Sequence, residues 1–275
     1  MPPRLMGVVN VTPDSFSDGG RYVEWEAAVA HGRQLLAEGA DIVDVGGEST
    51  RPGATRPLVV EELARVVPVI TALAADGAVV SVDTMRAEVA AAAIGAGATM
   101  VNDVSGGLAD PAILDVVAGS AATYVAMHWR GHADRMQSLA RYDEPGGVLE
   151  AVVRELGERS EAARTAGIPD DRLVLDPGLG FAKTADHNWA LVAGTDRLQA
   201  LGLPLLVGGS RKSFLGSLLA GADGEPRPVL DREAASTALT LLLAMRGVWG
   251  IRVHDVRASA DALAVLGRLQ HEERP

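Results

Sequence analysis

Polar or charged residues stand at the end of each of eight short apolar runs in this 275-residue chain. Enzymes built on parallel strands carry their reactive groups where the strands end, so the pattern indicates one site assembled from many strands. Helix capping is the alternative for an isolated carboxylate, and we favour it for Asp103 and Asp110. The series in chain order is Asn10, Glu48, Asp83, Asn102 with Asp103, His128, Asp176, Ser210-Arg211-Lys212, and Arg252 with His254.

Acidic and basic residues of this series occupy different parts of the chain. Carboxylates Glu48, Asp83 and Asp176 accept hydrogen bonds, whereas the basic groups follow only the last two runs. Such a set would hold a ligand that has hydrogen-bond donors along one edge and an anion at the other end.

Arg252 and His254 lie two residues apart in a strand-like run, so their side chains point the same way. We predict that this direction is inward, because Ile251 and Val253 suit the side that faces the helices. An inward arginine needs an anionic partner. We favour a bound anion over a structural ion pair as that partner.

The spacing of apolar and polar residues predicts eight strand–helix pairs. The strand candidates are residues 5–9, 41–45, 79–82, 99–101, 123–127, 173–175, 205–207 and 250–253. The helix candidates are residues 25–38, 60–75, 87–95, 111–118, 148–166, 185–201, 231–246 and 259–270, with a short helix at 214–220 and Asp231 as a cap. The strands are apolar on both faces, which is typical of parallel sheets covered by helices. We therefore predict an α/β chain that forms a single (β/α)8 TIM-barrel domain over residues 1–275, with an open doubly wound sheet as the alternative.

Composition excludes several classes of protein. The net charge of −11 argues against a nucleic-acid binder or a protein of anionic membranes, because both need a basic face. The chain contains no cysteine, which excludes disulfides, thiolate metal sites and thiol catalysis. Its first residues do not resemble a signal peptide, and no apolar run reaches the ~18 residues of a membrane span. We expect a cytoplasmic protein.

Seven motifs in this chain resemble those of the dihydropteroate synthases, in the order of that family. The two long ones are MGVVNVTPDSFSDGG at residues 6–20 and DVGGESTRPG at residues 44–53. The five short ones are SVDT at 81–84, NDVSGG at 102–107, DPGLGF at 176–181, SRKSF at 210–214 and RVHD at 252–255. The resemblance implies a pterin-binding TIM barrel, usually dimeric. Enzymes of this family join 4-aminobenzoate to 6-hydroxymethyl-7,8-dihydropterin pyrophosphate, which gives 7,8-dihydropteroate and pyrophosphate in folate synthesis, and sulfonamides compete with the aminobenzoate.

The resemblance also implies a role for each matched residue. Asp83, Asn102, Asp176 and Lys212 would hold the pterin, while Asn10, Arg252 and His254 would hold the pyrophosphate. Asn10 would also bind a Mg²⁺ ion that bridges phosphate oxygens. The aminobenzoate site would be lined by Phe16, Asp18, Thr50, Arg51, Pro52, Phe181 and Ser213. Asp176, Lys212, Arg252 and His254 would be the catalytic groups.

We favour a dissociative order, in which the C–O bond of the pterin substrate breaks before the arylamine attacks. No cysteine nucleophile exists and His254 is committed to an anion, so a covalent enzyme intermediate is not indicated. The alternatives are a pterin-binding methyltransferase, a non-catalytic paralogue, and an aldolase that uses Lys212 as a Schiff base. The pyrophosphate set and both long motifs argue against them.

The motif loops at residues 14–20 and 49–53 lead to a prediction about the order of binding. Their Gly, Ser and Pro content gives them little apolar surface, so we expect the bound pyrophosphate and Mg²⁺ to order the first loop and the second to close over it. Asp18 and Arg51 would bridge the two loops. We predict that 4-aminobenzoate and sulfonamides bind at least ~10-fold more tightly when pyrophosphate, Mg²⁺ and a pterin are present. Titration of labelled 4-aminobenzoate with and without these components measures the coupling, and an unchanged affinity means a preformed pocket.

Overall fold

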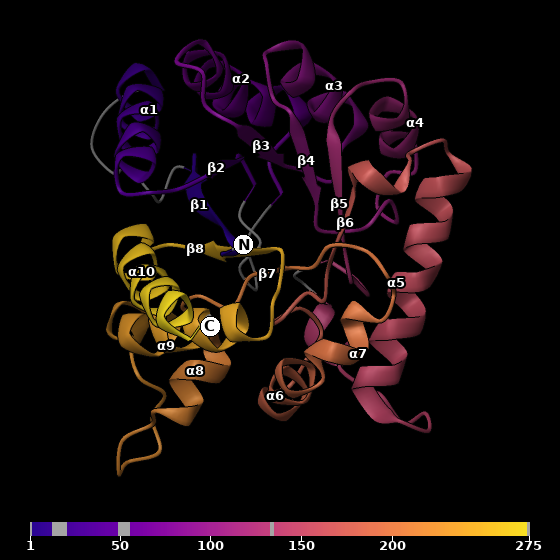
Figure 1. The fold of residues 1–275 in the computed structure, drawn as a ribbon. Coiled ribbons are helices and arrows are strands. Elements are labelled where there is room, and N and C mark those ends of the chain that lie inside the picture. Colours follow the sequence, from indigo (N-terminus) through magenta and orange to yellow (C-terminus); the bar gives the residue numbers. More distant parts are fainter. Residues whose placement is uncertain (1, 13–20, 49–55, 133–134, 274–275) are drawn as a thin grey trace.

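The strands of the computed structural model form a barrel of eight parallel strands, as the sequence predicts (Figure 1). The model describes residues 2–12, 21–48, 56–132 and 135–273. Seven neighbouring pairs are hydrogen-bonded in the order β6-β5-β4-β3-β2-β1-β8-β7. A bridge between Leu175 and Leu205 joins the two ends of this order, and the Leu175 N–H donates to the Pro204 carbonyl at 2.9 Å. The strands are β1 (Arg4–Asn10), β2 (Ile42–Gly46), β3 (Val80–Asp83), β4 (Met100–Asp103), β5 (Thr123–Met127), β6 (Leu173–Asp176), β7 (Leu206–Val207) and β8 (Gly250–Val253).

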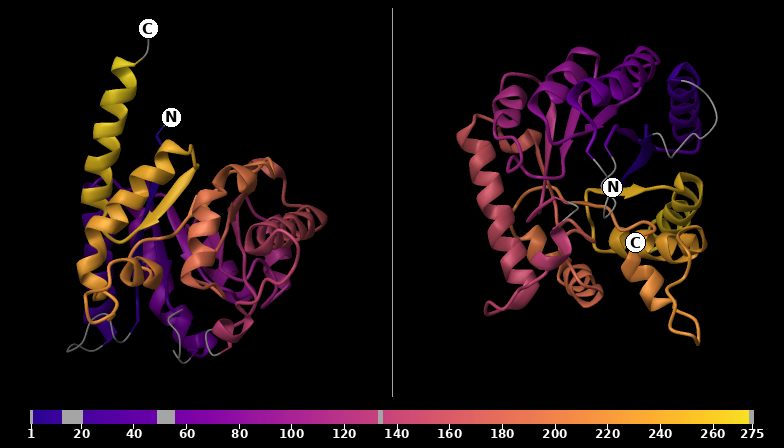
Figure 2. Two further views of the ribbon diagram at one scale, coloured as in Figure 1. Left: turned by 90° about the horizontal axis from the view of Figure 1, so that it is seen from below. Right: turned by 180° about the vertical axis from the view of Figure 1, so that it is seen from behind.

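Helices surround the strands on the outside (Figure 1), and the end of the last helix projects past the body of the protein (Figure 2, left). They are α1 (Arg21–Ala37), α2 (Val59–Ala75), α3 (Ala87–Gly95), α4 (Ala112–Ala118), α5 (Gly147–Thr165), α6 (Ala185–Ala193), α7 (Thr195–Gln199), α8 (Ser213–Leu218), α9 (Glu233–Met245) and α10 (Val256–Glu272). None of the helices in the described residues is both long and apolar enough to cross a membrane.

The single helix predicted over residues 185–201 is wrong, because the chain breaks there into α6 and α7 at Gly194. A Cβ atom at Gly194 would lie 2.5 Å from a methyl carbon of Leu149 on α5. The side chain of Leu149 thus occupies the space that any larger residue at the break would need.

The predicted cap at Asp231 is also wrong. A 3₁₀ helix, η4 (Val229–Arg232), runs directly into α9, so the residue before α9 is Arg232, and no side chain caps this helix. The N–H of Asp231 itself bonds to the Pro228 carbonyl at 3.1 Å within that turn.

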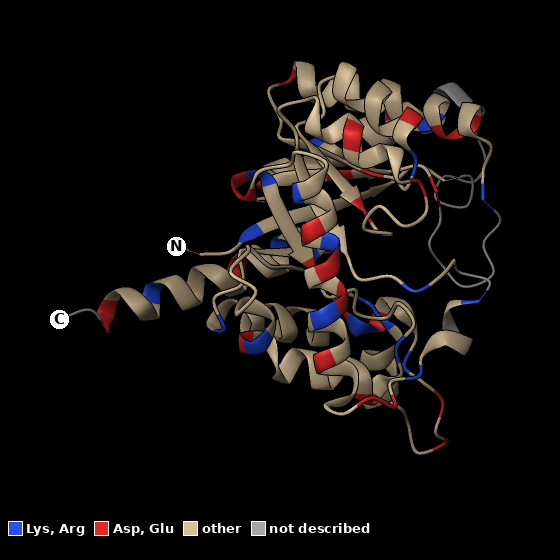
Figure 3. Cartoon of the chain, turned by 90° about the vertical axis from the view of Figure 1, so that its right-hand side faces the viewer, with Lys and Arg blue, Asp and Glu red and all other residues tan. Residues whose placement is uncertain are grey.

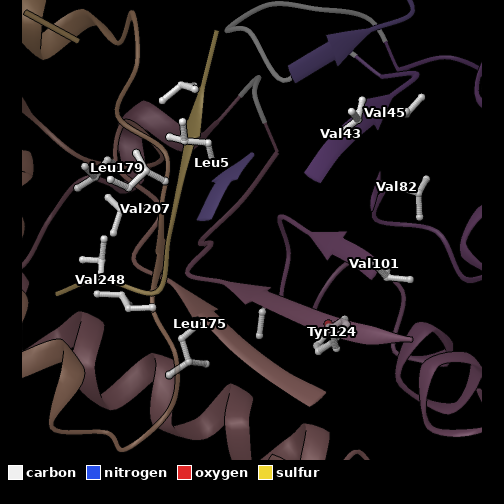
Figure 4. Close-up of a cluster of buried hydrophobic side chains, with 14 of the residues drawn as sticks. Leu5, Val43, Val45, Val82, Val101, Tyr124, Leu175, Leu179, Val207 and Val248 are labelled. Atoms are coloured by element: carbon white, nitrogen blue, oxygen red, sulfur yellow. The ribbon is translucent and has the colours of Figure 1, made fainter. Parts of the chain in front are cut away.

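Alternate residues along the strands separate two apolar layers. Side chains that face the helices, among them Leu5, Val43, Val101, Tyr124 and Leu175, belong to the large outer core (Figure 4). The intervening positions point into the barrel, where a smaller cluster forms its floor: Met6, Ile42, Met100, Val125, Val174 and Leu206.

Polar residues follow this floor at a spacing of two. Asp44 comes two residues after Ile42, Asn102 after Met100, and Asp176 after Val174. Because side chains alternate along a strand, these polar groups also point inward, one layer nearer the carboxyl ends of the strands. The apolar floor therefore closes the barrel below a polar layer formed by these inward side chains.

Charges of both signs alternate along the outer helices on the side shown in Figure 3. Pairs on this exposed surface include Arg154 with Glu144 at 2.9 Å and with Glu158 at 3.2 Å. Exposed pairs of this kind contribute little to stability. A mixed pattern differs from the continuous basic face that nucleic-acid binding requires.

Candidate active site

The carboxyl ends of the strands bring together most of the predicted site residues. Asn10 ends β1, Asp83 ends β3, Asp176 ends β6, and Asn102 lies one residue before the end of β4. Arg252 lies on β8 with His254 just after it, and Lys212 follows β7. The carboxyl end of the barrel therefore brings together carboxylates, carboxamides and bases that the sequence grouped into one site.

Arg252 points inward, as predicted, and is paired with two carboxylates. Its Nε donates to Oδ2 of Asp44 at 2.6 Å, and its Nη2 donates to Oδ2 of Asp83 at 2.8 Å. Asn102 donates from Nδ2 to the same Asp44 oxygen at 2.9 Å. The structural ion pair that we considered second is thus present, and Asp44 is its buried centre.

The charges in this cluster are only partly compensated. Burial raises the pKa of Asp83 to about 7, against the opposing pull of Arg252 and with the help of the neighbouring Asp44 carboxylate. Oδ1 of Asp44 and the hydroxyl of Ser81 are buried with no hydrogen-bond partner among the described residues. One arginine is therefore shared between two carboxylates, and acceptor capacity remains.

Asp176 and Lys212 carry opposite charges, and each affects the pKa of the other. Oδ1 of Asp176 accepts the N–H of Gly178 at 2.7 Å, and burial raises the pKa of this carboxyl although Lys212 opposes the rise. Lys212 donates to the Leu179 carbonyl and lies 4.8 Å above the centre of the Phe181 ring. Burial lowers the pKa of Lys212 to about 8, and Asp176 opposes this change. The lysine is thus largely protonated at pH 7 and can donate to a carbonyl oxygen.

Lys212 is presented by a strained backbone position. Arg211 has φ +62°, in the left-handed region that non-glycine residues rarely adopt. Its N–H donates to Ser236 at 3.0 Å, its carbonyl accepts from Arg232 at 2.9 Å, and its side chain pairs with Glu233. Contacts from η4 and α9 therefore hold the turn that aims Lys212 into the barrel.

The remaining predicted residues lie at the mouth. His254 contacts Ser210 twice: its N–H donates to the hydroxyl at 3.3 Å, and its Nδ1 lies 3.0 Å from the same oxygen. Asn10 is exposed at the end of β1, and Ser213 is exposed at the first residue of α8. Phe16, Asp18, Thr50, Arg51 and Pro52 lie outside the described residues.

Two other carboxylates of the predicted series, Glu48 and Asp103, have structural partners, and so does Asp110. Glu48 pairs with Arg56 at 2.8 Å and with Arg86 at 3.8 Å. Asp103 accepts from the N–H of Ser105 at 2.8 Å and from the Tyr124 hydroxyl at 2.7 Å, on the helix side of β4. Asp110 accepts the N–H of Ala87 at 2.7 Å, at the start of α3. Asp110 thus bonds the first N–H of α3, as the capping interpretation predicts, whereas Asp103 holds the turn after β4 rather than a helix end.

Sequence reasoning missed two buried charges, Asp44 and Lys183. Asp44 is fully buried, and its signal was its register: a lone carboxylate on the inward side of an apolar strand. Lys183 is 4% exposed, and its Nζ lies 2.9 Å from Nδ1 of His128, which the series included without a role. No periodic pattern marks Lys183, because it lies in the loop between β6 and α6.

The barrel and the acidic, basic and carboxamide side chains at the carboxyl ends of its strands are typical of an enzyme site for a small polar ligand. Residues 6–254 match the family model described as pterin binding enzyme. The chain is 53% identical over 272 residues to the dihydropteroate synthase of Mycobacterium leprae, covering 98% of this chain and 94% of the relative. It also resembles the solved dihydropteroate synthase of Xanthomonas albilineans with 4-aminobenzoic acid, at 49% identity and TM-score 0.88, covering 98% of this chain and 93% of that one. A Yersinia pestis dihydropteroate synthase in a sulfonamide drug complex matches at 39% identity and TM-score 0.88, covering 98% of this chain and 95% of the other. The chain belongs to the pterin-binding enzyme family and, within that family, to the dihydropteroate synthases, which are transferases.

The lowered pKa of Lys212 yields a prediction about stability. A lysine whose pKa falls from 10.5 to about 8 on folding opposes folding fully below pH 8, and this effect fades as the pH rises from 8 to 10.5. The shift corresponds to about 3 kcal/mol. We predict that Lys212→Met increases the free energy of unfolding by about 1–3 kcal/mol at pH 7 and by less than ~1 kcal/mol at pH 10, although it removes activity.

Denaturant titration at both pH values measures this difference. The matched control is Arg268→Met on α10, where the arginine side chain is 70% exposed and its loss changes stability little. An equal gain from Lys212→Met at pH 7 and pH 10 contradicts the prediction.

Proposed function

We propose that this chain joins 4-aminobenzoate to 6-hydroxymethyl-7,8-dihydropterin pyrophosphate, producing 7,8-dihydropteroate and pyrophosphate, and that sulfonamides occupy its aminobenzoate site. The observation that carries this proposal is the placement of Asp83, Asn102 and Asp176 at the carboxyl ends of β3, β4 and β6, with Lys212 following β7. A pterin presents ring N–H and amino donors along one edge and a carbonyl oxygen nearby. The polar layer offers carboxylate acceptors, and Lys212 offers a donor, for these groups.

The proposed reaction begins with cleavage of the C–O bond to the pyrophosphate. This cleavage leaves a pterin methylene cation whose charge spreads over the ring. The Asp176 carboxylate would stabilise that charge from a site shielded from water. The aminobenzoate nitrogen would then attack the methylene carbon. Because an arylamine is a weak base, its proton leaves afterwards without a strong general base on the enzyme.

Magnesium is the metal that this family implies, and the donors at the mouth fit it. The described residues contain no group of three or more His, Cys, Asp or Glu that could hold a metal ion, so a cation at the mouth would take most ligands from the substrate. Asn10, exposed at the end of β1, supplies a carboxamide oxygen of the hard type that Mg²⁺ accepts. Bound there, the ion would neutralise charge on the departing pyrophosphate.

Arg252 and His254 are the proposed protein partners of the pyrophosphate. Arg252 already shares its charge between Asp44 and Asp83, so the pyrophosphate would compete with these carboxylates for the guanidinium. His254, oriented by Ser210, would donate from its ring. A homodimer and a cytoplasmic location stay predictions from the sequence.

The proposal is tested by pyrophosphate release that depends on added 4-aminobenzoate. A methyltransferase on the same barrel would release no pyrophosphate, and a non-catalytic paralogue would bind the pterin without turnover. Release without 4-aminobenzoate, or no release with both substrates and Mg²⁺ present, contradicts the proposed function.

The role of Asp176 gives the first prediction from this mechanism. Asp176→Asn keeps the shape of the side chain but removes the charge that stabilises the cation. We expect kcat/KM to fall by at least ~100-fold, which corresponds to roughly 2.7 kcal/mol of transition-state stabilisation. Steady-state kinetics with circular dichroism as a fold control measures this effect. Near-normal turnover by a folded variant contradicts the assigned role.

The two possible partners of Arg252 can be separated by calorimetry. If its main role is to bind the pyrophosphate, Arg252→Ala weakens the pyrophosphate substrate far more than the unphosphorylated hydroxymethyl-dihydropterin. If its main role is to neutralise Asp44 and Asp83, both ligands lose affinity equally, because both depend on the carboxylate edge. We expect the first result. Equal losses would move Arg252 out of the anion site.

A further inference from the structure

The loop between β6 and α6 has a backbone that must be held in place. Gly178 has φ +65°, and a Cβ atom there would lie 2.4 Å from the His128 carbonyl oxygen, so only glycine fits. Ala182 has φ +50°, although it is not a glycine. Such a conformation persists only where surrounding contacts impose it.

Two buried polar side chains stabilise this loop conformation. Nζ of Lys183 donates to the Phe181 carbonyl at 2.9 Å, and the hydroxyl of Tyr142 donates to the Ala182 carbonyl at 3.0 Å. These bonds tie down two consecutive carbonyls of the strained turn. We call Lys183 and Tyr142 the loop clamp.

A series of contacting side chains links Lys183 to Glu155 and Arg130. Nζ of Lys183 lies 2.9 Å from Nδ1 of His128, whose Nε2 lies 2.9 Å from Glu155, and Glu155 accepts from Nε of Arg130 at 3.0 Å. Burial and the Lys183 charge lower the pKa of His128 to about 4, so the ring is neutral at pH 7. A neutral ring accepts from Lys183 at Nδ1 and donates to Glu155 at Nε2. Burial lowers the pKa of Lys183 itself well below its usual value, and the series links this buried amine to Glu155 and Arg130.

The upper side of the same loop contacts Lys212. The Leu179 carbonyl accepts from Lys212, and the Phe181 ring lies beneath its ammonium group. The full sequence contains two lysines among its 25 basic residues, and both donate to carbonyls of this loop, Lys183 to that of Phe181 and Lys212 to that of Leu179.

We propose that Lys183 is a positioning residue. Its hydrogen bond to the Phe181 carbonyl fixes the turn, and this turn fixes the Phe181 ring and the Leu179 carbonyl that contact Lys212. Lys183 is 4% exposed and lies within this loop, two residues after Phe181. The expected effect of Lys183 on kcat/KM rests on the proposed function, whereas its expected effect on the position of the Lys212 side chain does not.

The test uses Lys183→Met, which keeps the length and apolar stem but donates no hydrogen bond. The matched control is Arg172→Met. Arg172 also donates to backbone carbonyls, those of Ser120 at 2.7 Å and Ala122 at 2.9 Å, but near the amino ends of β5 and β6. It therefore reports the cost of losing a partly buried cation far from the site.

Because the chain has two lysines, protein labelled with ¹³C-lysine gives one signal for Lys212 in Lys183→Met. We expect this signal to lose its ring-current shift and move toward that of free lysine, while Arg172→Met leaves it unchanged. We expect kcat/KM to fall at least ~20-fold in Lys183→Met and less than threefold in the control. An unmoved Lys212 signal together with a kcat/KM within threefold of the control overturns the proposal.

Tyr142→Phe removes the other clamp bond and keeps the ring, so it tests the proposal if Lys183→Met does not fold. We expect a smaller shift of the Lys212 signal in the same direction, and no shift overturns the proposal. If the wild-type protein releases no pyrophosphate, the proposed function fails, but the Lys212 signal still decides whether the clamp exists.

Discussion

An arginine placed inside the barrel is the constraint on which the site depends. The interior of a barrel is normally filled with aliphatic side chains, and a charge there is costly unless it is paired. Arg252 meets this requirement with Asp44 and Asp83, on strands that lie on the far side of β1 from β8. The pairing orders three strands around one guanidinium. It also leaves an excess of carboxylate, and burial, with a smaller contribution from the Asp44 charge, raises the pKa of Asp83 to about 7.

This excess is the physical basis of ligand recognition. A fully compensated ion pair would offer a ligand little, because every donor would already have its acceptor. Two carboxylates share one arginine here, and Asn102 donates to Asp44. The polar layer therefore retains carboxylate acceptors for the donor-rich edge of a ring. The apolar floor beneath excludes water from below, which strengthens electrostatic interactions above it.

Much of this arrangement could be predicted from the sequence, because alternation along strands is a local signal. The bounds predicted for β5, β8 and α3 are those observed, and the inward direction of Arg252 followed from its apolar neighbours Ile251 and Val253. The partners of Arg252 could not be predicted in this way, since Asp44 lies 208 residues earlier and reads locally as a single polar residue in an apolar strand. Ion pairs between distant strands depend on the closed barrel, which no local pattern encodes.

The loops carry the part of the site that is hardest to predict, for a related reason. Local propensity favours glycine where φ is positive, yet Ala182 and Arg211 adopt this conformation next to the two lysines of the chain. Each is held by contacts from other elements: Tyr142 for the first, and Ser236, Arg232 and Glu233 for the second. A glycine would remove the strain but would also let the turn relax, so the direction of the lysine would no longer be fixed. The strained backbone at Ala182 and Arg211 therefore fixes the direction of the lysine that follows each of them. The contacts that offset this strain support the active site by positioning these lysines.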